Sequence, residues 1–209
     1  ETCMKYDFQA AMVAPCYIEL AKDVLKGTGI QVASTLNFPI ANDTLPMKIA
    51  ALKEMIKTGV NQFDFPPNPG LLLGGEEKAY FEEMRQIVEV AHASGVIVKA
   101  MLEFGYITTP ELKKKAAQLA CEAGIDWVKT STGQYGGPSV QDVMLMVDAV
   151  KGTKTKVKVA GVKDPRPQNA FCFIQAGAEL IGTRAAVEIL DAVDDLRKIG
   201  LIPAYTGDK

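Results

Sequence analysis

Short apolar runs alternate along the chain with longer stretches in which apolar residues recur at helical spacing. We expect strands over 11–14, 31–36, 61–65, 96–102, 126–130, 156–160 and 179–183. We expect helices over 17–26, 43–58, 75–94, 109–123, 138–151, 166–176 and 184–198. Glycine ends several of the helical stretches, as at Gly59, Gly95, Gly124 and Gly177. Such regular alternation predicts a parallel sheet whose strands are connected by helices.

One helix-to-strand turn recurs, in the sequences ASGV at 93–96, AGI at 123–125 and AGA at 176–178. A repeated unit of this kind is typical of a β/α barrel or of a doubly wound open sheet. No G-x-G-x-x-G or P-loop motif supports a nucleotide-binding open sheet. We therefore expect an α/β fold of the (β/α)8 TIM-barrel class, as a single domain over 1–209. Because the pattern shows seven strands and a closed barrel needs eight, we expect the first β/α unit to be missing or truncated at the N-terminus.

The charge balance and the few histidines and cysteines limit the kinds of partner and of catalytic group that we expect. The 23 Lys and Arg against 25 Asp and Glu give a net charge of −2, so we expect neither a nucleic-acid nor a membrane partner. The four cysteines show no metal-binding spacing, and His92 is the only histidine, so we expect no metal site, no cofactor and no histidine-based triad. No apolar run reaches transmembrane length, and we expect a cytoplasmic protein. The chemistry must then use Lys, Asp, Glu, Tyr or hydroxyl groups.

Polar residues interrupt several of the expected strands or follow them directly. They are Asn37, Asp64, Lys99, Glu103, Lys129 and Lys158. Any one of them alone is explained by a side chain that reaches solvent or forms an ion pair. A barrel, however, gathers the inward side chains of all its strands and places catalytic groups at their carboxyl ends. We therefore expect the ionisable groups of four strands to converge.

Converging lysines disfavour one another's charged form, and burial adds to that effect. A neutral lysine amine attacks carbonyl groups and forms a Schiff base, which then accepts electrons when a carbon–carbon bond breaks. A nearby carboxylate would transfer protons. This chemistry is that of a metal-independent class I aldolase. The residues alone do not rank Lys129 above Lys99 or Lys158.

The sequence DWVKTSTG at 126–133 resembles the Schiff-base strand of the deoxyribose-phosphate aldolase family, whose usual form is DFIKTSTG. Further segments resemble that family in the same order, from about residue 12 to about residue 190. They are STLNFPIAND at 34–43, NQFDFPPNPGLLLGG at 61–75, VKAMLEFGYIT at 98–108, KVKVAGVKDPRP at 156–167 and GAELIGTRAAVEIL at 177–190.

The resemblance implies cleavage of 2-deoxy-D-ribose 5-phosphate to acetaldehyde and D-glyceraldehyde 3-phosphate. Lys129 would form the Schiff base, Lys158 would be the cation that favours its neutral amine, and Asp64 would transfer protons through a water molecule. Supporting polar groups are expected at Lys99, Glu103, Asn37 and Thr130. The resemblance also implies a homodimer or larger homo-oligomer and a C-terminal tyrosine, here Tyr205, that enters the site.

The family's phosphate pocket is altered in this chain. A glycine is missing beside Gly161, and Arg184 and Ala185 stand where the family has serines. Backbone N–H groups and arginine still bind anions well, so we expect a small phosphorylated aldose as substrate. The expected phosphate-binding residues are Gly161, Val162, Lys163, Gly182, Thr183 and Arg184. Two alternatives stay open: a Schiff-base aldolase for a different hydroxy-aldehyde, and a non-catalytic barrel that binds a sugar phosphate.

Overall fold

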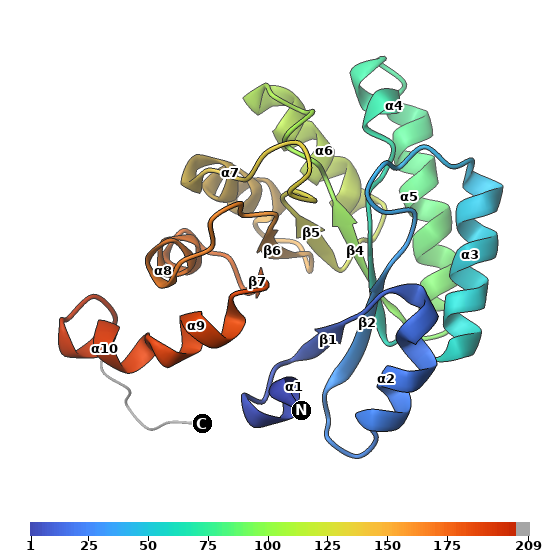
Figure 1. The fold of residues 1–209 in the computed structure, drawn as a ribbon. Coiled ribbons are helices and arrows are strands. Elements are labelled where there is room, and N and C mark those ends of the chain that lie inside the picture. Colours follow the sequence, from blue (N-terminus) through green and yellow to red (C-terminus); the bar gives the residue numbers. More distant parts are fainter. Residues whose placement is uncertain (204–209) are drawn as a thin grey trace.

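The computed structural model describes residues 1–203, which form a parallel sheet flanked by helices (Figure 1). In the described residues the sheet has seven strands, hydrogen-bonded in chain order and all parallel. They are β1 (Ala10–Met12), β2 (Gln31–Thr35), β3 (Gln62–Phe65), β4 (Ile97–Met101), β5 (Trp127–Lys129), β6 (Lys156–Ala160) and β7 (Leu180–Gly182). Each of the expected strands overlaps one of these.

Helices fill the connections between strands. They are α1 (Thr2–Lys5), α2 (Ile18–Val24), α3 (Leu45–Thr58), α4 (Pro69–Leu73), α5 (Glu77–His92), α6 (Pro110–Glu122), α7 (Val140–Val150), α8 (Pro167–Gln175), α9 (Ala186–Asp191) and α10 (Val193–Lys198), with a 3-10 turn at Pro15–Tyr17. The short α4 was not expected; the Asn68 side chain caps it by accepting from the Gly70 N–H. The helix expected over 184–198 is divided at Ala192 into α9 and α10. Within residues 1–203, no helix has the length and apolar character needed to span a bilayer.

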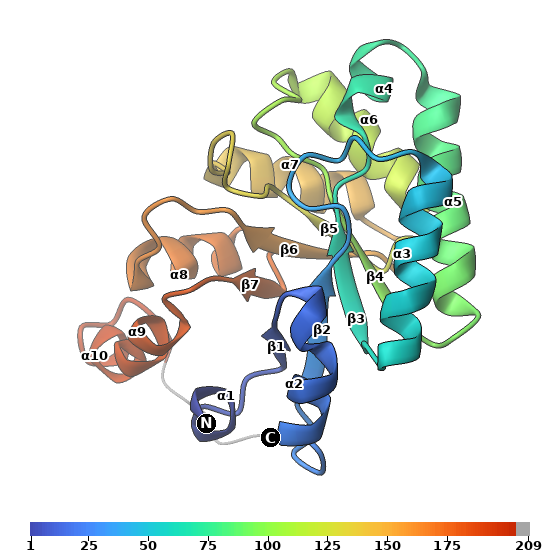
Figure 2. The same ribbon diagram turned by 45° about the vertical axis from the view of Figure 1, so that its right-hand side comes forward.

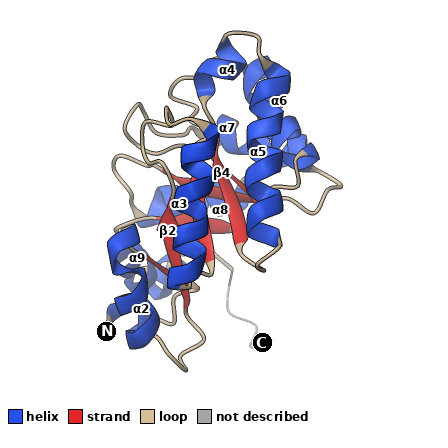
Figure 3. Ribbon diagram, turned by 90° about the vertical axis from the view of Figure 1, so that its right-hand side faces the viewer, coloured by secondary structure: helices blue, strands red, loops and turns tan. Residues whose placement is uncertain are grey.

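The sheet curls so strongly that its edge strands, β1 and β7, face each other (Figure 2). Helices lie over the outer side of the curled sheet (Figure 3). The inner side of such a sheet is the lumen of the barrel. This arrangement is a TIM-barrel-like α/β fold with a curled parallel sheet. The expected additional β/α unit before Glu1 stays a prediction.

Alternation along the strands separates the apolar core from the polar lumen. Phe63, Phe65 and Val98 are buried in the hydrophobic core together with residues of the surrounding helices. Because successive strand residues point to opposite faces, the residues directly next to them on each strand point into the lumen. Asp64 and Lys99 are two of these, and both are fully buried.

Candidate active site

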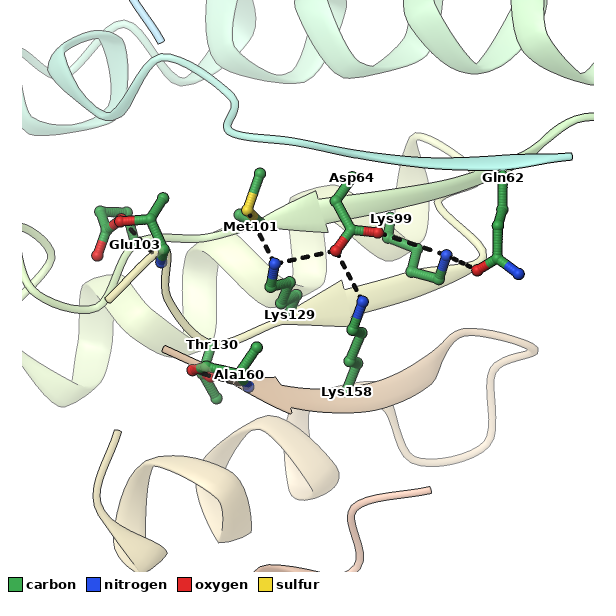
Figure 4. Close-up of polar contacts among 10 residues, drawn as sticks. Gln62, Asp64, Lys99, Met101, Glu103, Lys129, Thr130, Lys158 and Ala160 are labelled. Carbon is green, nitrogen blue, oxygen red and sulfur yellow. Dashed lines mark hydrogen bonds and ion pairs between the residues drawn. The ribbon is translucent and has the colours of Figure 1, made fainter. Parts of the chain in front are cut away.

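Three lysines surround one carboxylate in the lumen (Figure 4). Asp64 Oδ2 lies 2.9 Å from Lys129 Nζ and 2.7 Å from Lys158 Nζ. Asp64 Oδ1 lies 3.4 Å from Lys99 Nζ. The four side chains come from four neighbouring strands, β3 to β6. Asp64 and Lys99 are completely buried, while Lys129 and Lys158 keep side-chain exposures of 9% and 7%.

The register of the strands produces this grouping. Asp64 is paired with Lys99 across β3 and β4, and Lys129 is paired with Lys158 across β5 and β6. Met101, two residues after Lys99, is paired with Lys129, and its sulfur lies 3.2 Å from Lys129 Nζ. Side chains two residues apart on a strand share a face, so both pairs point into the same lumen. Lys129 is the last residue of its strand.

Electrostatics keep Asp64 ionised. Burial alone would raise the pKa of this carboxyl group, but the charges of Lys129, Lys158 and Lys99 together hold the pKa well below its ordinary value. A hydrogen bond from Lys158 adds to the lowering. Asp64 is therefore ionised at neutral pH while all three lysines surround it, and it is held within reach of their amines.

The same burial acts on the lysines in the opposite direction. Loss of water around the ammonium group lowers the pKa of Lys158 to about 8, although the negative charge of Asp64 opposes the change. The other two lysines add to the lowering. Burial also lowers the pKa of Lys99, again against the attraction of Asp64. An unprotonated amine is thus accessible at Lys158 close to neutral pH.

Three further residues take part in the cluster that the sequence pattern did not indicate. Met101 contacts Lys129 as described, and Gln62 Oε1 accepts a hydrogen bond from Lys99 Nζ. Gln62 Nε2 in turn donates to Gln31 Oε1. Gln62 lies two residues before Asp64 on β3, so the period of the strand could have placed it in the lumen. Its short polar contacts depend on the neighbouring strands.

Three of the supporting residues expected from the sequence, Glu103, Thr130 and Asn37, bond to groups outside the lysine cluster. The Glu103 carboxylate is buried in the loop after β4, where Oε2 accepts from the Thr132 N–H at 3.0 Å. The Thr130 hydroxyl instead bonds to the backbone of Ala160 in β6, at 2.8 Å to the carbonyl and 3.1 Å from the N–H. Asn37 bonds to Asp43 within the loop after β2, through both its amide nitrogen and its amide oxygen. In the structure, the contacts of Thr130 and Asn37 therefore hold strand ends and loops in place.

Glycines let the loops approach one another beside the cluster. Gly161 has a φ of +77°, and a Cβ added there would lie 2.6 Å from the Gly133 nitrogen. The backbone after β6 thus packs directly on the backbone after β5, which a side chain would prevent. At the end of β7, a Cβ on Gly182 would lie 2.8 Å from Lys158 Cε. The absence of a side chain at Gly182 makes room for Lys158.

The other expected phosphate-binding residues lie in the same two loops. Val162 packs partly against the core, whereas Lys163 is exposed after β6. Arg184 is exposed after β7, and the Thr183 hydroxyl there accepts from the Ala185 N–H at 3.0 Å. Tyr205 lies outside the described residues. Within residues 1–203, no three His, Cys, Asp or Glu side chains come together as a metal-binding group.

Comparison with known proteins identifies the family. The model of the DeoC/LacD family of aldolases matches residues 8–166. The chain belongs to the DeoC/LacD aldolase family. It is 41% identical over 192 residues to a deoxyribose-phosphate aldolase of Streptococcus equi subsp. zooepidemicus, covering 91% of this chain and 84% of that protein. It is 37% identical over 198 residues to the deoxyribose-phosphate aldolase of Thermococcus kodakarensis, covering 93% of this chain and 87% of that protein.

A solved structure supports the same assignment. The tetrameric deoxyribose phosphate aldolase of Aeropyrum pernix matches with a TM-score of 0.84 and 25% identity, covering 93% of this chain and 81% of that chain. The predicted family and the predicted aldolase class are therefore confirmed. The matched residues 8–166 of this DeoC/LacD aldolase include the whole lysine cluster, but they end before Gly182 and Arg184.

In this DeoC/LacD aldolase the cluster offers two chemical groups that carbon–carbon bond cleavage needs. Buried amines with lowered pKa values, as at Lys158, favour attack on a carbonyl carbon. A carboxylate that is ionised before the reaction begins is placed beside them to accept and return protons. Both groups lie in the lumen, on the neighbouring strands β3 to β6.

Proposed function

We propose that this aldolase cleaves 2-deoxy-D-ribose 5-phosphate to acetaldehyde and D-glyceraldehyde 3-phosphate through a Schiff base on Lys129. The observation that carries the proposal is the buried group of three amines around the single carboxylate of Asp64. The curated relatives at 41% and 37% identity are named for the same substrate. Lys129 is chosen because it ends its strand and its side chain, 9% exposed, is the most accessible of the three lysines.

The reaction begins at the aldehyde carbon of the open-chain sugar. The unprotonated Lys129 amine adds to this carbon, and loss of water gives a protonated imine. Water leaves only if the hydroxyl oxygen is protonated, and Lys158 lies beside Asp64, 2.7 Å from its Oδ2, in position to supply that proton. The crowding of three amines around one carboxylate disfavours the fully protonated cluster, so an unprotonated amine is available for the attack.

Cleavage then needs a base at the hydroxyl group on carbon 3. Removal of that proton forms the carbonyl of glyceraldehyde 3-phosphate, and the bonding electrons between carbons 2 and 3 move into the imine as an enamine. Asp64 is the proton carrier of this step and returns the proton to carbon 2. Hydrolysis of the resulting imine releases acetaldehyde and restores the Lys129 amine.

The phosphate end of the substrate is proposed to bind at the loops after β6 and β7. Lys163 and Arg184 supply exposed positive charges there, and the backbone at Gly161 is free of any side chain. Arginine binds phosphate in a bidentate way, which suits a site in which it replaces hydroxyl donors. Val162, Gly182 and Thr183 complete these two loops.

Borohydride trapping tests the proposal. Acetaldehyde and borohydride together should leave an ethyl group on Lys129, located by peptide mass spectrometry, and Lys129→Met should abolish both this adduct and cleavage of deoxyribose 5-phosphate. Lys114→Met, on the exposed surface of α6, is the matched control and should behave as the unaltered protein. An adduct on Lys158 or Lys99 in place of Lys129, or no adduct at all, would refute the assignment.

Assembly and location follow as further parts of the proposal. We propose that the protein acts in the cytoplasm as a homodimer or larger homo-oligomer; the tetrameric relative from Aeropyrum pernix supports the latter. Its cysteines within the described residues are free thiols, which suits a reducing compartment. A closed eight-stranded barrel completed by a unit before Glu1 belongs to the same proposal, supported by the curled sheet with facing edges.

A further inference from the structure

A chain of side-chain amides continues from the lysine cluster toward the amino-terminal ends of the strands. Lys99 donates to Gln62 Oε1 (Figure 4). Gln62 Nε2 in turn donates to Gln31 Oε1. Gln62 is 1% exposed and Lys99 is fully buried. The chemistry fixes the orientation of the amides, because an ammonium group can only donate and so requires the oxygen of Gln62. The nitrogen of Gln62 is left to face an acceptor, which is Gln31 Oε1.

A carboxylate at position 62 could accept the hydrogen bond from Lys99 as well as the Gln62 amide does. The charged side chains that face the cluster are Asp64, Lys99, Lys129 and Lys158. Asp126, just before β5, adds a further attraction on Lys99. The residues of β1, β2 and β7 are uncharged throughout. Three lysines therefore share one carboxylate in direct contact, and Gln62 satisfies Lys99 without adding a second negative charge.

We propose that Gln62 is a positioning residue whose uncharged amide holds Lys99 against Asp64 while leaving the lysine cluster short of negative charge. The shortage keeps one amine of the cluster unprotonated near neutral pH, which Schiff-base formation needs. The part of this inference that concerns catalysis rests on the proposed aldolase function. The effect of Gln62 on the protonation of the lysines can be measured without any turnover of substrate.

The substitution Gln62→Glu separates this role from a purely structural one. Gln62→Glu keeps the shape of the side chain and an oxygen acceptor for Lys99, so a residue needed only to hold Lys99 would tolerate it. An added carboxylate in contact with an ammonium group raises the pKa of the amine by about 1 to 3 units. The amines farther from position 62 receive a smaller shift of the same sign, because the interaction weakens with distance.

The experiment compares the pH dependence of deoxyribose 5-phosphate cleavage in the unaltered protein and in Gln62→Glu. The acidic limb, where the rate rises as the lysine cluster loses a proton, should move to higher pH by about one unit. In parallel, the 13Cε resonances of labelled lysines are titrated, and Lys99 should deprotonate at higher pH in the variant. Gln62→Met, which removes both hydrogen bonds without adding charge, should lower the rate without moving the acidic limb upward.

Gln31→Glu provides a second charged variant, one step farther along the amide chain, for which a smaller upward shift is expected. It also keeps the test decisive if Gln62→Glu does not fold. An unchanged acidic limb and unchanged lysine titrations in a folded Gln62→Glu or, failing that, Gln31→Glu protein would overturn the inference. Inactivity of the unaltered protein would instead overturn the proposed function, and the 13C titrations would still decide the role of Gln62.

Discussion

Replacing Lys158 with methionine should flatten the dependence of folding stability on pH. The Lys158 side chain is 7% exposed, and burial lowers its pKa to about 8 from an ordinary 10.5. Between these two values the unfolded chain binds more protons than the folded protein. The free energy of unfolding must therefore rise as pH rises through this interval.

The size of the effect follows from the pKa difference. The difference between 10.5 and about 8 is about 2.5 units, which at about 1.4 kcal/mol per unit corresponds to about 3 kcal/mol. About 2 kcal/mol of this should be recovered between about pH 7 and about pH 9.5, before tyrosine side chains begin to ionise. In Lys158→Met this gain is lost, while Asp64 keeps Lys129 and Lys99 as partners.

Urea unfolding at a series of pH values measures the effect as the difference between the two stability curves. Lys156→Met is the control, since Lys156 lies two residues earlier on β6 with a half-exposed side chain; its curve should run parallel to that of the unaltered protein. If the Lys158→Met curve is also parallel to the unaltered curve, Lys158 is not held by burial in the way described here.

Two further variants test packing. Lys48→Met should cost about 3–5 kcal/mol of unfolding free energy, because it leaves Glu83 buried without its partner at 2.5 Å; the double variant Lys48→Met/Glu83→Leu should recover most of the loss. Urea unfolding measures the stability of both variants. If the double variant loses as much unfolding free energy as Lys48→Met, the unpaired Glu83 charge is not the cause of the loss. Gly161→Ala should lower stability by more than the 1–3 kcal/mol of left-handed backbone strain, because its Cβ would meet the Gly133 nitrogen at 2.6 Å. Gly152→Ala is the control, because Gly152 has a φ of +80° but no atom lies within 4 Å of the added Cβ, so this variant measures the backbone strain alone. If both variants lose the same unfolding free energy, the contact between position 161 and Gly133 costs nothing.

Part of the candidate site was readable from local pattern. Asp64, Lys99, Lys129 and Lys158 interrupt apolar runs, and alternation along a strand predicts that they share the lumen face. The same alternation argues against Thr130 as a lumen group, because it follows Lys129 directly and should point to the opposite side. Its bonds to Ala160 agree with that reasoning.

Other contacts needed the packing of the whole sheet. Gln62 has no unusual spacing in the sequence, and only the stagger between β2, β3 and β4 brings it to both Lys99 and Gln31. Asn37 was expected near the site, but the turn after β2 directs its side chain to Asp43. Loop contacts of this kind depend on backbone conformations that side-chain periodicity does not encode.

By itself, the sequence determined the order of strands and helices, the positions of the lumen lysines and the family, because these depend on short-range periodicity and on motifs. The tertiary structure alone decided which amines share Asp64, that Lys158 is buried enough for its pKa to fall to about 8, and that Gln62 completes the cluster. The physical reason is that charge interactions and desolvation depend on distances between strands. Those distances are set by the register and curl of the entire sheet.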